Sequence, residues 1–72
     1  MADPVSWKVV ERGWTVVDEH GEELGHVNEV TGDPEADIFD GVEISHGLLS
    51  HTEYVPSERV VEIREGEVIV RR

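Results

Sequence analysis

Short runs of alternating apolar and polar residues, separated by turn residues, constrain the fold of this chain more than any other feature. Valine and isoleucine dominate the apolar set, and turn residues recur roughly every 8 to 12 positions. No window longer than two turns carries the apolar stripe of a helix. The sequence therefore predicts an all-β domain of five or six short antiparallel strands, over residues 7–18, 24–31, 38–45, 52–55, 60–64 and 67–71.

Turn residues predict how these strands connect. Asp18 suits the first position of a hairpin turn because its side chain bonds the following backbone, and Gly21 suits the last position, where φ is often positive. Glu65-Gly66 is a second tight turn, which closes the last hairpin. Between the fourth and fifth strands, Ser57-Glu58-Arg59 indicates a single helical turn with Ser57 as its cap.

The phase of the alternation predicts where strands bend and which side chains turn inward. It slips between Val27 and Val30, and Gly25 has no side chain to pack, so a bulge or sharp bend is expected there. A bend of this kind allows a sheet to curl toward a barrel. In the third strand the pattern predicts Ile38, Val42 and Ile44 on one face, with Phe39 and Glu43 on the other.

The chain has 72 residues and no cysteine, which bounds how it can be stabilised. A domain this short buries only about 60% of the surface of its unfolded chain. Without disulfides, an efficient core or a second copy of the chain is the expected stabiliser. We expect a flexible tail over residues 1–5 and one domain over 6–72. The absence of a secretory signal pattern and of a long apolar run predicts a cytoplasmic protein with no membrane insertion.

The formal net charge is −11, from 17 acidic and 6 basic residues. A negative field repels nucleic acid and anionic lipid, because phosphate binding relies on lysine and arginine. The charge therefore disfavours direct contact with nucleic acid. It favours a cationic partner.

Two stretches of the chain resemble the marks of a known family. Residues 17–27 read Val-Asp-Glu-His-Gly-Glu-Glu-Leu-Gly-His-Val, which is similar to the Asp-x-x-Gly turn and apolar-Gly-x-Val strand that open PRC-barrel domains. Residues 54–63 read Tyr-Val-Pro-Ser-Glu-Arg-Val-Val-Glu-Ile, which resembles the family's apolar-Val-Pro segment with its short turn and following strand. The run Glu67 to Val70 fits the last strand, so the resemblance covers roughly residues 13 to 71.

The resemblance implies a small, partly open β-barrel that serves as an adaptor. Such domains occur in the H subunit of the photosynthetic reaction centre, in a ribosome maturation factor and as stand-alone proteins. The barrels of this family supply no catalytic constellation of their own. The resemblance therefore implies no active-site residues and no cofactor, and it leaves a role beside RNA or the ribosome as an alternative.

The acidic stretch from residue 33 to 43 is a candidate cation site. Asp33, Glu35 and Asp37 alternate, and calcium prefers six to eight oxygen ligands. The helix-loop-helix calcium pattern, however, requires glycine at its sixth position, where this chain has Ile38. A solvated acidic loop is the favoured interpretation.

Histidines offer a second metal hypothesis. His46 and His51 flank one connection, and His26 approaches them if its strand lies alongside. Three imidazoles can bind zinc, but the spacing lacks the two-histidine pattern of a ligand pair. The neighbouring pairs Ser45-His46 and Ser50-His51 point to opposite faces of a strand, which excludes a nucleophile and base within either pair. The chain is predicted not to be an enzyme.

Aromatic and apolar residues outside the strand pattern are the candidate interaction residues. Trp7 precedes the family-like region and is expected to cover an open barrel end or to contact another chain. Leu48 and Leu49 stand side by side in a connection, where both cannot easily turn inward. Tyr54 belongs to a residue type enriched at interface centres, whereas Trp14 is assigned to the core.

These observations lead to one hypothesis and its rivals. We expect a non-enzymatic interaction or adaptor module that forms a homodimer through strand edges or through the surface of Trp7 and Leu48-Leu49. The alternatives are a small-ligand or divalent-metal protein that uses the acidic loop or the histidines, and a ribosome or RNA-processing accessory domain.

Overall fold

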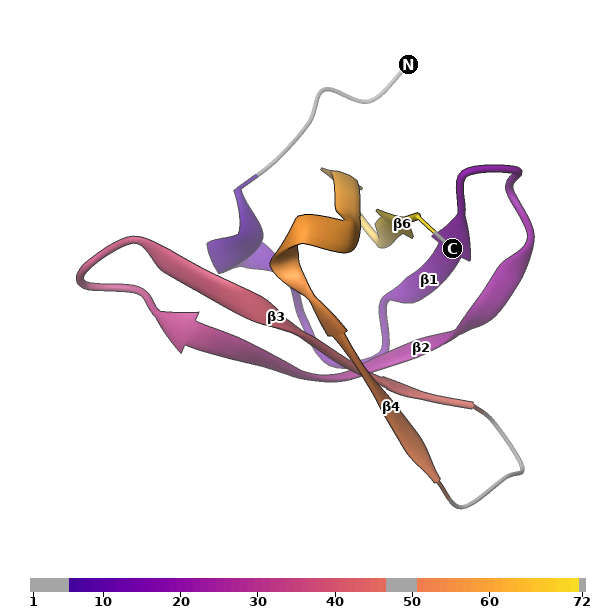
Figure 1. Cartoon of the computed structure of the whole chain (residues 1–72), viewed down its shortest axis with the longest axis horizontal. Coiled ribbons are helices and arrows are strands. Elements are labelled where there is room, and N and C mark those ends of the chain that lie inside the picture. Colours follow the sequence, from indigo (N-terminus) through magenta and orange to yellow (C-terminus); the bar gives the residue numbers. More distant parts are fainter. Residues whose placement is uncertain (1–5, 47–50, 72) are drawn as a thin grey trace.

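The computed structural model describes residues 6–46 and 51–71, and these residues form an almost entirely β fold (Figure 1). Six strands and two short 3-10 turns follow one another along the chain, which confirms the predicted fold class. In order they are η1 (Trp7–Val9), β1 (Thr15–Asp18), β2 (Glu23–Asp33), β3 (Ile38–Ser45), β4 (Thr52–Pro56), η2 (Ser57–Arg59), β5 (Val60–Arg64) and β6 (Glu67–Val70).

The strands make one curled sheet in the order β4-β3-β2-β1-β6-β5. Neighbours pair antiparallel except for β1 and β6, which pair in parallel from Thr15 opposite Glu67 to Asp18 opposite Val70. The two ends of the order, β4 and β5, are consecutive in the chain and are joined only by the three residues of η2. Such a short connection requires the sheet to curl until its ends approach each other. The described residues leave the sheet unclosed, as a partly open barrel.

Only the end of the predicted first strand segment, residues 7–18, is extended in the structure. Trp7–Val9 forms a 3-10 turn, in which the Ser6 hydroxyl accepts a hydrogen bond from the backbone N–H of Lys8 at 3.2 Å. Gly13 then has a φ of +95°, a conformation that breaks an extended strand and that glycine adopts without strain. The strand therefore begins only at Thr15.

The first hairpin turn is confirmed in its atomic detail. The backbone N–H of Gly21 donates to the carbonyl oxygen of Asp18 at 3.0 Å, and Gly21 has a φ of +83°. The Asp18 side chain is only 5% exposed, and its Oδ1 accepts from the backbone N–H groups of His20 and Glu22 at 2.8 and 2.9 Å. The second turn is likewise confirmed, with Gly66 at a φ of +84° between β5 and β6.

The predicted irregularity in β2 is also confirmed. The register of β2 against β3 shifts between Val27 and Glu29. Gly25 is buried, and a Cβ atom there would collide with the backbone carbonyl oxygen of Ser45 on β3. The absence of a side chain at Gly25 thus allows two strands to approach closely where the sheet bends.

The predicted facing of Ile38 is wrong. Thr31 pairs with Gly41 and Gly32 pairs with Phe39, so Asp40 is an extra residue on β3. A bulge of one residue inverts the alternation on one side of it. Phe39 consequently packs against the core, whereas Ile38 is exposed.

The helical turn near residue 57 is confirmed, but Ser57 is not its cap. Ser57 is the first residue of η2, and the cap position belongs to Pro56, whose side chain makes no hydrogen bond. Proline has no side-chain oxygen to accept one, so η2 is held by its backbone bond from the N–H of Val60 to the carbonyl oxygen of Ser57.

Every strand contributes to one apolar core. The buried cluster among the described residues consists of branched aliphatic side chains: Val16, Val27, Val42, Ile44, Val55, Ile63, Val68 and Val70. This composition follows from the strand pattern, since β-branched side chains pack well on a pleated surface. None of the helical turns in the described part of the chain is long and apolar enough to cross a membrane.

Candidate interaction surfaces

Trp7 is held by contacts within the chain. Its ring stacks on Phe39 with ring centroids 5.3 Å apart, and its Nε1 donates to the Asp37 Oδ1 at 3.2 Å. Lys8 Nζ lies 3.5 Å from the same Asp37 oxygen. Trp7 is half-buried and packs against the core. These contacts tie η1 to the β2–β3 hairpin, which extends to the left in Figure 1.

Of the two candidate interaction residues that the structure describes, Tyr54 is more accessible than Trp7. It lies on β4, at one end of the sheet order, and is 50% exposed. Its ring and hydroxyl lie beside the Cα of Gly41, where a Cβ would collide with them. Leu48 and Leu49 lie outside the described residues.

The opposite end of the sheet order carries a second accessible apolar residue. Val61 on β5 is 52% exposed, and the β5–β6 register shifts between Val60 and Glu62, so Val61 is a bulge. A depression of about 250 Å³ beside it is lined by Trp7, Phe39, Ser57 and residues 60–63. The unpaired edge of β5 thus borders apolar side chains.

Two carboxylates of the acidic loop, those of Asp33 and Asp37, bind other groups of the same chain. The Asp33 Oδ1 accepts from the backbone N–H groups of Glu35 and Ala36, at 3.1 and 3.3 Å. Asp37 binds Trp7 and Lys8, as described above. Within residues 6–46 and 51–71, no group of three or more acidic or histidine side chains is arranged to hold a metal ion.

The structure brings two of the three candidate histidines together. The rings of His46 and His51 stack with centroids 5.3 Å apart, and the Nε2 of His46 lies 3.1 Å from the Glu53 Oε1. His26 is exposed, on β2, and pairs in register with Ser45 on β3. The His46–Glu53 contact links the end of β3 to β4 across the connection between them.

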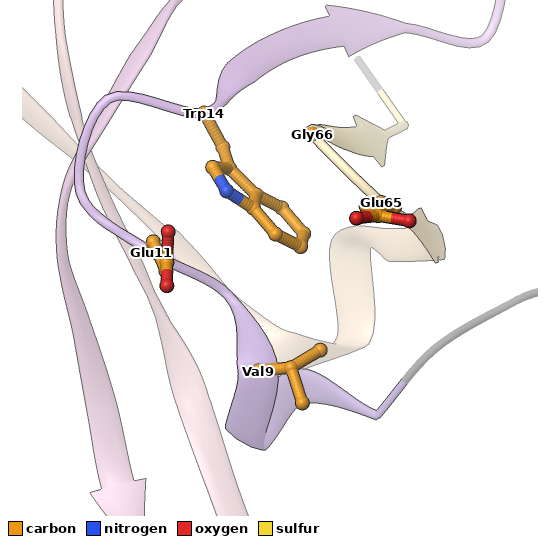
Figure 2. A pocket seen from close by; sticks show the side chains of 5 residues that line it. All are labelled: Val9, Glu11, Trp14, Glu65 and Gly66. Atoms are coloured by element: carbon orange, nitrogen blue, oxygen red, sulfur yellow. The ribbon is translucent and has the colours of Figure 1, made fainter.

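Another hollow lies between residues 9–14 and the β5–β6 turn. It has a volume of about 550 Å³ and is lined by Val9, Glu11, Trp14, Glu65 and Gly66 (Figure 2). We call it the Trp14 groove. Figure 2 shows the Trp14 indole projecting between Glu11 and Glu65, with Val9 across the hollow.

Sequence reasoning missed the Trp14 groove. Trp14 packs against the core, as the sequence predicts, but it also forms a wall of the groove. A backbone hydrogen bond from the N–H of Thr15 to the carbonyl oxygen of Gly66, 3.1 Å long, brings the β5–β6 turn beside it. Glu11 and Glu65 are far apart in the sequence, and no sequence pattern indicates that they lie near each other. They line one groove because the parallel pairing of β1 with β6 brings the segments before these two strands together.

The order and pairing of the strands define a small β domain built from one curled, partly open sheet. A search of curated proteins finds no relative that matches the chain. The family model of the PRC-barrel domain matches residues 12–72. The chain belongs to the PRC-barrel domain family, and η1 with its Trp7 lies before the matched residues.

Proposed function

We propose that this domain is a non-enzymatic protein-interaction module that self-associates through an open edge of its sheet. The observation that carries the proposal is the sheet order, which leaves β4 and β5 each paired on one side only among the described strands. An edge strand presents unpaired backbone N–H and C=O groups, and pairing with a second strand satisfies them.

The side chains along these edges support association. Tyr54 on β4 and Val61 on β5 are about half exposed, and a depression with both apolar and polar lining residues adjoins Val61. Tyrosine is enriched at interface centres. A domain of this length can bury little apolar area within one chain. Association with a second copy buries additional apolar area and so stabilises the fold.

Net charge predicts how self-association depends on salt. Two copies that each carry a formal charge of −11 repel one another. Salt screens that repulsion, with a Debye length of about 10 Å at 0.1 M and about 3 Å at 1 M. We therefore expect the dimer to strengthen as salt is added. Binding of a cationic partner protein weakens under the same change.

Sedimentation equilibrium at micromolar concentration, in 0.05 M and 0.5 M NaCl, tests the proposal. We expect a dimer that is more populated at the higher salt. Lysine within an edge strand opposes edge pairing, so Tyr54→Lys or Val61→Lys should shift the protein to monomer and reveal which edge is used.

Val9→Lys is the matched control, since Val9 is 51% exposed, lies on η1 rather than on a strand, and gives the same change in charge. Circular dichroism verifies that each variant remains folded. A protein that stays monomeric at both salt concentrations contradicts self-association. A dimer that both edge variants and the control leave unchanged contradicts the assignment to the strand edges.

A further inference from the structure

The wall of the Trp14 groove is positioned before any ligand binds. Backbone hydrogen bonds fix Trp14 on both sides: its N–H donates to the Glu11 carbonyl oxygen at 3.2 Å, and its own carbonyl oxygen accepts from Val27 at 2.8 Å. Part of the indole packs against the core while another part faces the hollow. A held aromatic surface binds a ligand without a large cost in side-chain entropy.

The rim of the groove carries two carboxylates, those of Glu11 and Glu65. Glu11 and Glu65 are exposed and form no ion pair within residues 6–46 and 51–71. The basic residues next to the groove in sequence are Lys8, Arg12 and Arg64. Each is engaged with another side chain: Lys8 with Asp37, Arg12 with Asn28 and Arg64 with Glu62.

An aromatic wall between two unpaired carboxylates is complementary to an organic cation. A guanidinium group is planar, stacks on a tryptophan face and donates two parallel hydrogen bonds to a carboxylate. The volume of about 550 Å³ lies in the range of ligand sites, about 300 to 1,000 Å³. We propose that the Trp14 groove binds an arginine side chain presented by a partner protein.

This inference rests on the proposed function, because it assumes that the domain acts by contact with a protein. It goes beyond self-association, because it specifies an arginine-bearing partner that is a different protein. The net charge of −11 attracts a basic partner from a distance, and the groove supplies the local contact. Discrimination between arginine and lysine comes from the stacking surface, since an ammonium group has no planar face.

Nuclear magnetic resonance titration with three short peptides tests the proposal. The peptides are capped Gly-Arg-Gly, Gly-Lys-Gly and a version in which citrulline, the neutral isostere, replaces arginine. We expect the arginine peptide to shift the Trp14 indole N–H resonance and to bind more tightly than the lysine peptide, with the citrulline peptide weakest. A Trp7→Phe background leaves Trp14 as the only tryptophan, so its signal is unambiguous.

Groove variants define the site. Glu11→Gln and Glu65→Gln should each weaken arginine binding about two- to fivefold at low salt, and Trp14→Leu should weaken it roughly tenfold. The double variant Glu29→Gln/Glu58→Gln has the same net charge as Glu11→Gln/Glu65→Gln, and neither of its residues lines the groove. It should bind as the parent does. Because the paired glutamine variants keep Trp14, the test survives if Trp14→Leu fails to fold.

Three results would overturn the inference: citrulline binding as tightly as arginine, lysine binding as tightly as arginine, or equal effects of the groove pair and the control pair. Each outcome is independent of the proposed self-association. If the domain dimerises but does not bind the arginine peptide, the result contradicts arginine binding and leaves self-association supported. If the domain is a monomer that binds the peptide through the groove, the result supports arginine binding and contradicts self-association.

Discussion

Removal of the Asp18 carboxylate is expected to destabilise this domain more than any other single change in a turn. Asp18 is 5% exposed, and its Oδ1 accepts two backbone hydrogen bonds, from His20 at 2.8 Å and from Glu22 at 2.9 Å. A hydrogen bond to a charged group stabilises a protein by about 1.5 to 3 kcal/mol. Both bonds are part-buried and both donor residues are exposed overall, so we apply the lower value to each bond.

The two bonds together give an expected loss of about 3 kcal/mol for Asp18→Ala. For a domain of 72 residues the total free energy of unfolding is on the order of 4 to 11 kcal/mol. A loss of that size lowers Tm by roughly 12 to 24 °C, at about 4 to 8 °C per kcal/mol. Asp18→Asn keeps an acceptor oxygen but loses the charge, so we expect a smaller loss of about 1 kcal/mol.

Urea and thermal unfolding followed by tryptophan fluorescence measure these losses. Asp33→Ala is the matched control, because Asp33 also accepts two backbone hydrogen bonds through Oδ1 but is exposed, and its bonds are longer, at 3.1 and 3.3 Å. We expect the control to cost about 0.5 kcal/mol or less. If Asp18→Ala costs no more than Asp33→Ala, burial of the carboxylate is not what makes this turn strong.

Two further predictions concern strand approach and capping. Gly25→Ala should destabilise the domain by about 3 kcal/mol in urea unfolding, at the upper end for an overpacked site, because its Cβ would collide with the Ser45 backbone carbonyl oxygen and the Ile44 side chain. Gly66→Ala should cost only about 1 kcal/mol, from its positive φ, because its Cβ meets nothing within 4 Å. An equal or smaller loss for Gly25→Ala would contradict the close approach of β2 and β3. Ser57→Ala should change stability by less than about 0.5 kcal/mol, since Ser57 is not a cap. A measured loss near 1 kcal/mol would restore the capping role.

The sequence alone determines the features that arise from contacts between residues close together in the chain. The Asp18–Gly21 and Glu65-Gly66 turns depend on hydrogen bonds and φ values within four residues, so their residue types predict them. Alternating Val and Ile predict the strands because the two faces of a strand follow from local backbone geometry. The family marks consist of these same local patterns, which is why the resemblance and the fold class are both confirmed.

The tertiary structure decides what depends on residues far apart in the chain. The Asp40 bulge exposes Ile38 because the register of β3 is set by its partner β2, which a single-strand pattern cannot reveal. Trp7 belongs to the predicted first strand segment, but in the structure it lies in η1. There it stacks on Phe39 and so connects η1 to the β2–β3 hairpin. The Trp14 groove forms only when β6 pairs in parallel with β1 and brings Glu65 beside Trp14. Strand pairing over long distances in the chain, rather than local pattern, therefore creates the surfaces through which this domain is proposed to act.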